Sequence, residues 1–344
     1  MLHTDMKPHP VAPWLSMVVL SFNRFEVTSG PCLETLRDAF ADPSLELVLV
    51  DNGSRDGAQE SCAEFAMREP GVRFLPQSEN LGFAGGMNAG VDIARGEWVC
   101  LINSDTLFPA GALAALKATL QGVPSDVAMV GPVTNAAGNG QCLPLPGSNM
   151  ITVVATGESA MHGSIGVLSP TYRTDFFCVA IRRKVWLELG GLDTSFGLGY
   201  YEDFDFSLRL RQAGWQQVIA EDVFIAHVGS ASFSVASSQQ RDLLRRNRAL
   251  MRRRYPDVNF EHAREGNATA LRHLIQVAQD GGWSKALRAR ASWRLAALLA
   301  DEPRSPLKRW RWRWRVRDIR RALASSSIEP QYPASTSGHA SPRT

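Results

Sequence analysis

Three carboxylates fall within four residues of the stretch YYEDFDFSLRLRQAGW, residues 200–215: Glu202, Asp203 and Asp205. Carboxylates this close repel one another, so a cation, a helix N-terminus or a raised pKa must offset the repulsion. The aromatic neighbours favour partial burial, and a half-buried carboxylate is suited to act as a general base. The alternative is an acidic helix cap in which Asp205 faces solvent.

Short polar clusters follow three apolar, β-branched runs of the chain. They are SFNR (21–24), DNGSRDG (51–57) and NSD (103–105), with the candidate binding residues Asn23, Asp51, Asn103 and Asp105. Ligands of open α/β sheets bind outside the carboxyl ends of the strands, so three clusters at one edge indicate a cleft. Each cluster alone also fits a turn or a helix cap, because Asp, Asn and Gly serve both purposes.

The glycine-rich stretch ENLGFAGGMNAG (79–90) invites comparison with phosphate-binding loops. Its glycines, at positions 82, 85, 86 and 90, do not match GxGxxG, and no GK[ST] ending follows. The segment after the first apolar run carries no dinucleotide fingerprint either. NAD binding and ATP hydrolysis are therefore disfavoured, although small residues would let a helix N-terminus approach an anionic ligand closely.

A single histidine, His227, ends another apolar run in DVFIAHVGSAS. Neutral imidazole is a common metal ligand. An isolated histidine more often has a packing or surface role, and the residues around His227 leave both roles open.

The elements that must position these residues follow from hydrophobic periodicity. Apolar runs at 15–21, 45–51, 72–76, 97–103 and 128–132 alternate with helical spacing at 57–69 and 109–121. This alternation predicts an α/β fold with a parallel sheet that is covered by helices on both faces. A further strand is expected near 176–182 and a helix that ends at Gly214. Residues 134–172, rich in Gly, Pro and Ser, predict a long functional loop.

Composition narrows the class of protein. The chain has 344 residues, 44% of them hydrophobic, which is enough for a real core. No uninterrupted apolar stretch reaches the length of a membrane span, and the first residues do not resemble a secretory signal. The five cysteines are scattered and form no CxxC pair, which favours reduced thiols in a cytoplasmic protein over a zinc site.

Charge is distributed unevenly. Residues 1–239 carry 14 basic and 25 acidic residues, whereas residues 240–322 carry 22 basic and 8 acidic residues. The sequence SPLKRWRWRWRVRDIRRAL (305–323) alternates Trp with Arg, which suits an anionic membrane surface. The alternative is a helix that packs on the protein with a solvated arginine face. Nucleic acid is a weaker candidate partner, because no recognised binding module accompanies the charge.

Taken together, these segments resemble a bacterial inverting glycosyltransferase of family 2. The resemblance implies the GT-A fold, an α/β fold with a Rossmann-like, mixed but mostly parallel sheet and helices on both faces. The matching pieces keep their order over roughly residues 15–256. They are VVLSFNR, LVLVDNGSRDG, ENLGFAGGMNAGVDIARGEWVCLINSDT, FFCVAIRRKVWLELGGLD, GLGYYEDFDFSLRLRQAGW, IAHVGSAS and LLRRNRALMRRRYP. The nearest likeness is to the rhamnosyltransferase-like branch, whose members build surface polysaccharides such as O-antigen.

The resemblance implies a role for each matching position. Asp203 would be the catalytic base, and Glu202 would position the base or the acceptor. Asp105 would hold Mg²⁺ or Mn²⁺ together with His227. Asn103 stands where the family has the first Asp of an Asp-X-Asp motif, and Met87 stands where many relatives carry Arg. The residues implied to bind the nucleotide-sugar donor are Asn23, Asp51, Asn80, Gly82, Asn88, Asn103 and Asp105.

The implied activity is metal-dependent transfer, with inversion, of a sugar from a dTDP- or UDP-linked donor to a hydroxyl group of a lipid-linked or oligosaccharide acceptor. Among donors, dTDP-rhamnose is favoured. The implied location is the cytoplasm or the inner face of the cytoplasmic membrane. Two rivals are nucleotidyl transfer of the pyrophosphorylase kind and a non-catalytic sugar-nucleotide-binding protein of a glycan assembly complex.

Four parts of the chain are expected. They are a flexible N-terminus (1–14), a GT-A catalytic domain (15–236), a basic helical C-terminal region (237–324) and a disordered tail (325–344).

Overall fold

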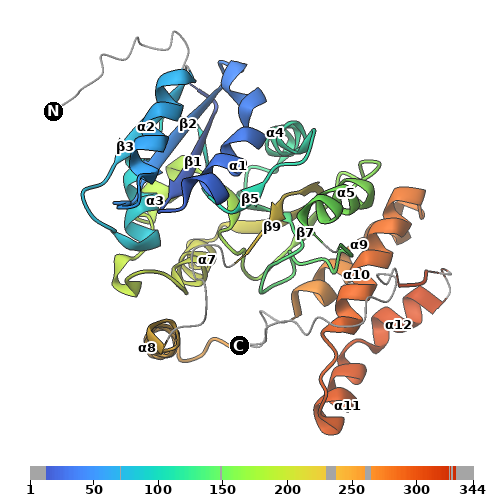
Figure 1. Ribbon diagram of the computed structural model, residues 1–344. Helices are drawn as coiled ribbons and strands as arrows, with labels where there is room; N and C mark the ends of the chain where they lie inside the picture. The colour runs from blue at the N-terminus through green and yellow to red at the C-terminus, as the bar shows by residue number, and fades with distance from the viewer. Residues whose placement is uncertain are drawn as a thin grey trace. The chain divides into compact units, whose positions relative to one another are not determined.

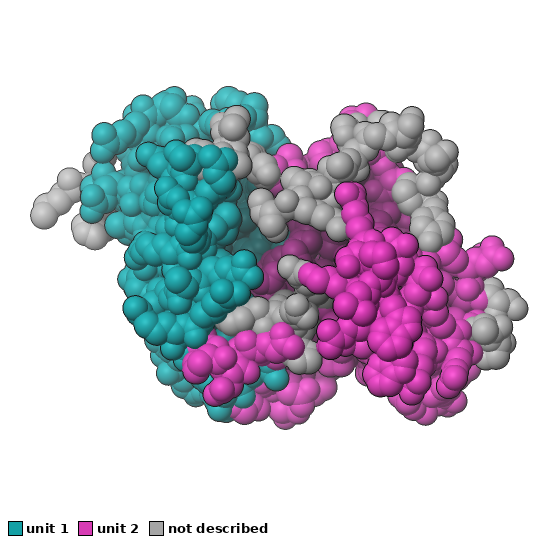
Figure 2. Space-filling model, turned by 90° about the horizontal axis from the view of Figure 1, so that it is seen from below, with its two compact units in different colours: residues 1–106, 176–213, 230–254 teal, residues 107–175, 214–229, 255–344 magenta. Residues whose placement is uncertain are grey.

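The computed structural model describes residues 13–69, 71–147, 149–229, 238–259, 265–324, 326 and 328–330. The expected N-terminal segment and tail therefore lie almost wholly outside the described residues. The chain divides into two compact units, coloured separately in Figure 2. Unit 1 comprises residues 1–106, 176–213 and 230–254, and unit 2 comprises residues 107–175, 214–229 and 255–344.

Unit 1 is built around a sheet in which β1 lies between β2 and β4. Strands β1, β2 and β3 of this sheet are labelled in Figure 1. The strands are β1 (Leu15–Ser21), β2 (Leu45–Asp51), β3 (Val72–Pro76), β4 (Trp98–Asn103) and β8 (Cys178–Arg182). β3, β2, β1 and β4 are parallel neighbours, and β8 adds to β4 in the antiparallel direction. The parallel sheet predicted from the apolar runs is confirmed for these four strands, and with antiparallel β8 the sheet is mixed and mostly parallel, as the resemblance implied.

The helices of unit 1 connect and flank these strands. They are α1 (Ser29–Thr35), α2 (Ala58–Arg68), α3 (Gly82–Ile93), α6 (Arg183–Glu188), α7 (Glu202–Gln212) and α8 (Ser238–Arg254), with short 3-10 helices η1 (Phe25–Val27), η2 (Arg37–Ala41) and η3 (Thr194–Phe196). The predicted helix over 57–69 thus corresponds to α2.

Two glycines explain the close packing of α3 on the sheet. A Cβ atom at Gly90 would lie 2.4 Å from Val18 Cγ1, and one at Gly86 would lie 2.5 Å from Leu20 Cδ1. Any side chain at either position would collide with β1. Part of the glycine-rich stretch therefore serves helix–sheet contact, and Met87, fully buried on the same helix, belongs to the core.

In unit 2, strand β9 lies between β6 and β7. The strands of this unit are β6 (Val127–Val133), β7 (Leu168–Pro170), β9 (Gln216–Phe224) and the short β10 (Ala226–His227), and β5 (Thr106–Leu107) spans the boundary between the units. Its helices are α4 (Ala112–Gly122), α5 (Met150–Ala160), α9 (Gly266–Gly281), α10 (Lys285–Ala300), α11 (Pro306–Arg315) and α12 (Arg317–Ala324).

The prediction of a long loop over 134–172 is wrong in part. Helix α5 forms within it, and strand β7 pairs with β9. The helix begins with a capping box in which the Asn149 side chain accepts from Thr152 N–H and the Thr152 hydroxyl accepts from Asn149 N–H. The polar cap and the Val-Thr-Gly composition conceal the helical period. Helix α4 also begins at Ala112, three residues beyond the predicted start at Pro109.

A charged pair is completely buried in unit 2. Arg294 of α10 and Glu221 of β9 form a salt bridge of 2.9 Å, and both side chains have no exposed surface. Arg294 also donates to Asn267 Oδ1 and to the carbonyl oxygen of Gly140. The guanidinium therefore links the sheet, α9 and a loop. These partners offset the cost of removing its charge from water.

Residues 305–323 form two helices. α11 ends at Arg315 and α12 begins at Arg317, so the helix is interrupted at Val316. Val316, Ile319 and Leu323 are buried in a cluster with α9 and α10. Leu307, Trp310 and Trp314 remain 67%, 67% and 58% exposed. Over the residues that the structure covers, no helix has the length and apolar character to cross a membrane.

Candidate active site

The polar clusters of unit 1 lie at one edge of its sheet. Ser21 is the register partner of Asp51, and Leu20 is that of Asn103. β1 connects onward to β2 on one side and lies beside β4 on the other, so the strand order reverses here. The carboxyl ends at such a reversal form the usual crevice for ligands in open α/β sheets. The expectation that these clusters share one edge is therefore confirmed for Asp51 and Asn103.

Asp51 anchors a turn at this edge. Its fully buried carboxylate accepts from Ser54 Oγ at 2.5 Å, from Ser54 N at 3.1 Å and from Gln59 Nε2 at 3.1 Å. Ser54 Oγ also accepts from the N–H of Asn23, and the Asn23 side chain accepts from the N–H of Arg55. Turn chemistry, the simpler explanation of DNGS, thus accounts for these bonds, and it also brings Asn23 beside Asp51.

The neighbouring Asn52 connects this edge to the start of α3. Asn52 Nδ2 donates to Asn80 Oδ1 and to the Gly82 carbonyl, each at 3.1 Å, and Asn52 Oδ1 accepts from Leu81 N–H. Asn80 Oδ1 also accepts from Gly82 N–H at 2.8 Å. The structure therefore groups Asn80 and Gly82 with the end of β2. Asn52, which the sequence reasoning treated only as a turn residue, forms the link.

The loop before α7 packs on the start of α3. Phe83 N–H donates to the Leu198 carbonyl at 3.2 Å, and a Cβ atom at Gly82 would lie 2.3 Å from the Gly197 carbonyl oxygen. Asn88 binds the same loop through two hydrogen bonds. Its Nδ2 donates to the Leu192 carbonyl, and its Oδ1 accepts from the Leu192 N–H. The loop that leads to Glu202 is thereby held against the segment that contains Asn80.

Two consecutive tyrosines, Tyr200 and Tyr201, adopt the left-handed conformation immediately before α7, with φ of 72° and 80°. Non-glycine residues adopt it at a cost of roughly 1–2 kcal/mol each. The fully buried Asn247 of α8 compensates by donating through Nδ2 to the carbonyls of Phe196, Gly199 and Tyr200 at 2.8–3.0 Å. Sequence reasoning missed Asn247, which lies far along the chain on a strongly basic helix.

Glu202 and Asp203 occupy the first turn of α7 in different environments. The side chain of Glu202 is buried, at 6% exposure, and its Oε2 has no hydrogen-bond partner within the described residues. Burial, and secondarily the charge of Asp203, raise the pKa of Glu202 from 4.5 to about 8. At neutral pH the pair therefore combines a protonated Glu202 with a half-buried Asp203, whose Oδ1 accepts from Phe204 N–H.

Asp205 has a structural role. It is 1% exposed, so the alternative in which it faces solvent is wrong. Its carboxylate pairs with Arg209 at 2.7 Å and with Arg254 at 3.3 Å. Arg209 in turn donates to the carbonyls of Leu189 and Gly191. These bonds fix α7 to the preceding loop and to α8.

The residues proposed to hold a metal ion lie in different units. Asp105 is buried after β4 in unit 1, and His227 lies in β10 of unit 2. His227 Nδ1 is 2.9 Å from the Ala136 carbonyl, which can only accept, so in the neutral ring Nε2 carries the lone pair that a metal requires. No group of three potential ligands gathers within the described residues. A carboxylate oxygen and an imidazole nitrogen are each donor types that a divalent ion such as Mn²⁺ accepts.

Comparison with known proteins shows a similarity to glycosyltransferases. Residues 16–173, just under half of the chain, match the family model for glycosyl transferase family 2. This region is similar to family 2 glycosyltransferase domains. The resemblance to family 2 glycosyltransferases, which the sequence motifs indicated, is therefore confirmed. The family assignment favours sugar transfer over the rival of a non-catalytic binding protein.

Curated relatives carry related names. The glycosyltransferase GlyG of Streptococcus pneumoniae is 33% identical over 24% of this chain and 28% of its own length. The N-acetylglucosaminyl-diphospho-decaprenol L-rhamnosyltransferase of Mycobacterium tuberculosis is 27% identical over 58% of this chain and 72% of its own. The chain thus spans less than a third of the first relative and nearly three quarters of the second.

A solved structure supports the fold. GalNAc-T7, determined with UDP, GalNAc and Mn²⁺, superimposes with a TM-score of 0.53 over 93% of this chain and 59% of its own, at 15% sequence identity. A likeness at this identity concerns the fold alone. With the sheet described above, the predicted GT-A class of the glycosyltransferase is confirmed.

Proposed function

We propose that the enzyme transfers a sugar, with inversion, from a nucleotide-sugar donor to a hydroxyl group of a surface-glycan acceptor. Rhamnose from a dTDP-linked donor is the proposed sugar, and a lipid-linked glycan is the proposed acceptor. The mycobacterial rhamnosyltransferase, similar over most of its length, supports both choices. The observation that carries the proposal is the packing of the loop before Asp203 on the segment that contains Asn80 and Gly82.

In the proposed mechanism, Asp203 accepts the proton of the attacking acceptor hydroxyl. The acceptor oxygen bonds to the anomeric carbon while the bond from that carbon to the diphosphate oxygen breaks, and attack from the opposite face inverts the centre. General base catalysis of this kind contributes about 10²–10⁴-fold. Burial and the charge of Asp203 raise the pKa of Glu202 to about 8, so Glu202 is protonated at neutral pH and cannot itself act as the base there.

Donor binding is assigned to the edge of the unit 1 sheet. Asn23, Asp51, Asn80 and Asn103 would contact the nucleotide there, as the sequence resemblance implies. Asn88 is also proposed as a donor residue, although its amide already bonds Leu192, so a ligand would have to compete with that contact.

A divalent cation is part of the proposal. Asp105 and His227 would hold Mg²⁺ or Mn²⁺, which when bound would neutralise negative charge on the departing diphosphate. Burial of Asp105 and the His227 tautomer support this assignment. Chelator is expected to abolish turnover, and added Mn²⁺ or Mg²⁺ to restore it. Full turnover in excess chelator would remove the metal from the mechanism.

The decisive experiment compares Asp203→Asn with the wild type on a panel of sugar nucleotides, with release of nucleoside diphosphate as the readout. Asp203→Asn is expected to lose at least about 100-fold in kcat, because the base is removed. Nucleotide binding in calorimetry should change by less than about threefold. Asp92→Asn, an exposed substitution on α3, is the matched control. Equal loss of binding and turnover would contradict a base role for Asp203.

We further propose that α11 lies on an anionic membrane surface, where a lipid-linked acceptor would be found. Leu307, Trp310, Arg311 and Trp314 recur at helical spacing, and all four are exposed. Exposed Trp beside Arg is typical of the membrane interface. The Trp310→Ala/Trp314→Ala variant should sediment at least fivefold less with anionic vesicles than the wild type. Met67→Ala, which removes an exposed apolar side chain elsewhere, should sediment like the wild type. Unchanged sedimentation of the tryptophan variant would refute the assignment.

A further inference from the structure

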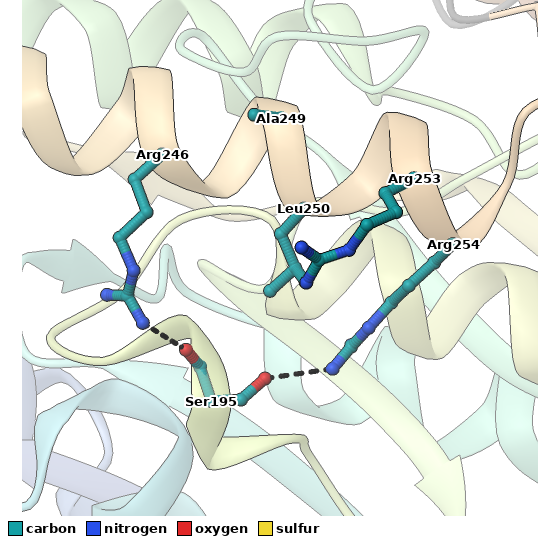
Figure 3. A pocket seen from close by; sticks show the side chains of 6 residues that line it. All are labelled: Ser195, Arg246, Ala249, Leu250, Arg253 and Arg254. Atoms are coloured by element: carbon teal, nitrogen blue, oxygen red, sulfur yellow. Dashed lines mark hydrogen bonds between the residues drawn. The ribbon is translucent and has the colours of Figure 1, made fainter.

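A surface pocket of unit 1 lies between α8 and the 3-10 helix η3, outside the residues assigned to donor binding (Figure 3). Its volume is about 490 Å³. The lining residues are Ser195, Arg246, Ala249, Leu250, Arg253 and Arg254. The five from α8 recur at intervals of three and four residues, so they form one stripe of the helix. One face of α8 therefore forms most of the pocket wall.

Two of the three arginines are held in place by Ser195. Arg246 donates to the Ser195 carbonyl at 2.8 Å, and Arg254 donates to Ser195 Oγ at 3.0 Å (Figure 3). Each guanidinium has five N–H donors, so these contacts leave donors for a ligand. A guanidinium that is already oriented loses less conformational freedom when it binds an anion.

The pocket carries excess positive charge. Arg254 is balanced by Asp193 at 2.6 Å and by Asp205 at 3.3 Å. Within the part of the chain that the structure describes, no carboxylate pairs with Arg246 or Arg253. Two uncompensated guanidinium groups in one concave site match the charge and geometry of phosphate groups, which arginine binds in a bidentate manner.

The apolar part of the lining narrows the class of ligand. Leu250 and Ala249 lie on the same stripe as the arginines, and none of the six lining residues is aromatic. The pocket thus offers no ring on which a nucleotide base could stack. Cationic groups beside an aliphatic surface fit a diphosphate attached to an aliphatic chain.

We propose that this pocket binds the diphosphate of a lipid-linked acceptor, beside the first part of its aliphatic chain. The proposal rests on the proposed function, because it assigns a second substrate to the same unit. Helix α8 carries both the pocket and Asn247, whose amide bonds the Gly199 and Tyr200 carbonyls just before Asp203. One rigid helix would therefore connect the acceptor's phosphates to the turn that presents the proposed base.

The test is a calorimetric titration of the full chain with inorganic pyrophosphate and with farnesyl diphosphate, in chelator and without donor. Binding is thus measured independently of turnover and of any divalent cation. Arg246→Gln/Arg253→Gln removes the two uncompensated charges of the pocket. The control, Arg248→Gln/Arg252→Gln, removes two charges from the same helix outside the pocket lining. Thermal unfolding of both variants should stay close to the wild type, because the pocket variant loses only the exposed hydrogen bond from Arg246 to the Ser195 carbonyl, and no described contact of Arg253 is lost.

The pocket variant should bind both probes at least tenfold more weakly than the wild type, since each charge-assisted contact contributes about tenfold or more. The control should stay within threefold. Farnesyl diphosphate should bind wild type at least tenfold more tightly than pyrophosphate, and Leu250→Ser should remove that advantage without weakening pyrophosphate binding.

Three results would overturn the proposal. Equal losses in the pocket variant and the control would show general charge attraction. Equal affinity of the wild type for the two probes would show a site for free phosphate and not for a lipid. No binding of either probe would show no site. None of these results depends on sugar transfer, so failure of the proposed function, seen as absent turnover with every donor, remains a separate outcome.

Discussion

Glu202 offers a sharp test of the electrostatics at the start of α7. Its buried carboxyl group should be protonated at neutral pH, because its pKa is raised to about 8 by burial and by the charge of Asp203. Substitution by Gln keeps the size and the neutral state of the side chain but cannot titrate. Glu202→Gln should therefore differ from the wild type only where the native carboxyl group is forced to ionise.

The sign of the effect follows from proton binding. The pKa of Glu202 is higher in the folded state than the ordinary value of 4.5 that applies to the unfolded chain. The protonated carboxyl contributes most to stability below about pH 4.5, and the contribution is lost as pH rises through about 8. At 1.36 kcal/mol per pKa unit, the free energy of unfolding of the wild type should fall by about 3 kcal/mol relative to Glu202→Gln between pH 5 and pH 8.

The assay is thermal unfolding of the wild type and Glu202→Gln at intervals from pH 5 to pH 8.5. The difference in Tm between the variant and the wild type should grow steadily with pH, by several degrees. Glu188→Gln, which replaces an exposed carboxyl group of α6, is the matched control and should show no such trend. A difference that stays constant across this range would refute the reasoning.

Activity gives a second reading of the same pair. Glu202→Gln should retain kcat within about fivefold at pH 7, since Gln reproduces the neutral side chain, whereas Asp203→Asn removes the proposed base. If Glu202→Gln were as inactive as Asp203→Asn, an ionised Glu202 would be required for turnover and the proposed division of roles would be wrong.

Further predictions concern the packing that supports the site. Asn247→Ala should lower the free energy of unfolding by about 2–3 kcal/mol and reduce kcat, because three carbonyls lose their donor and the Tyr200–Tyr201 turn loses its support; Tm and kcat are the readouts. Arg294→Met should cost about 3–5 kcal/mol by leaving the Glu221 charge buried alone, measured by thermal unfolding. Gly90→Val should cost at least about 1–3 kcal/mol through collision with Val18, again measured by thermal unfolding.

Each of these predictions has a control. Arg248→Ala, on the exposed side of α8, should leave Tm and kcat near wild type. Adding Glu221→Leu to Arg294→Met should recover much of the lost stability, because both charges then leave the interior. Gly122→Ala, where a Cβ atom meets nothing within 4 Å, should be neutral or stabilising. A loss in Gly122→Ala equal to that in Gly90→Val would show that glycine flexibility, and not crowding, explains the effect.

The strands could be predicted because buried strands give the sequence continuous apolar runs. The runs at 15–21 and 45–51 coincide with β1 and β2, since strands covered on both faces are almost continuously apolar. Strand direction has no such signature, and the antiparallel addition of β8 to β4 depends on the chain returning from unit 2. Helix α5 was missed because its apolar period is weak and its start depends on a local Asn149–Thr152 cap.

The carboxylates of the candidate site could be predicted from the sequence. The side chains that hold the surrounding loops in place could not. Asp51, Asp105 and Asp203 follow apolar runs or begin a helix, and a charge in such a place attracts notice. Asn52 and Asn247 are ordinary polar residues whose importance comes from the carbonyls they meet at long sequence separation. Only the folded chain shows which backbone oxygens need a donor.

The discontinuity of unit 1 has a consequence for biosynthesis. β4 ends at Asn103, and its second neighbour, β8, begins only at Cys178, with much of unit 2 in between. At about 5–20 residues per second, a ribosome needs roughly 4–15 s to make the intervening segment. During that interval the growing polypeptide displays a bare, strongly apolar strand edge, which is a template for unwanted association. We therefore expect chaperones to bind unit 1 during synthesis, while the edge of β4 still lacks β8.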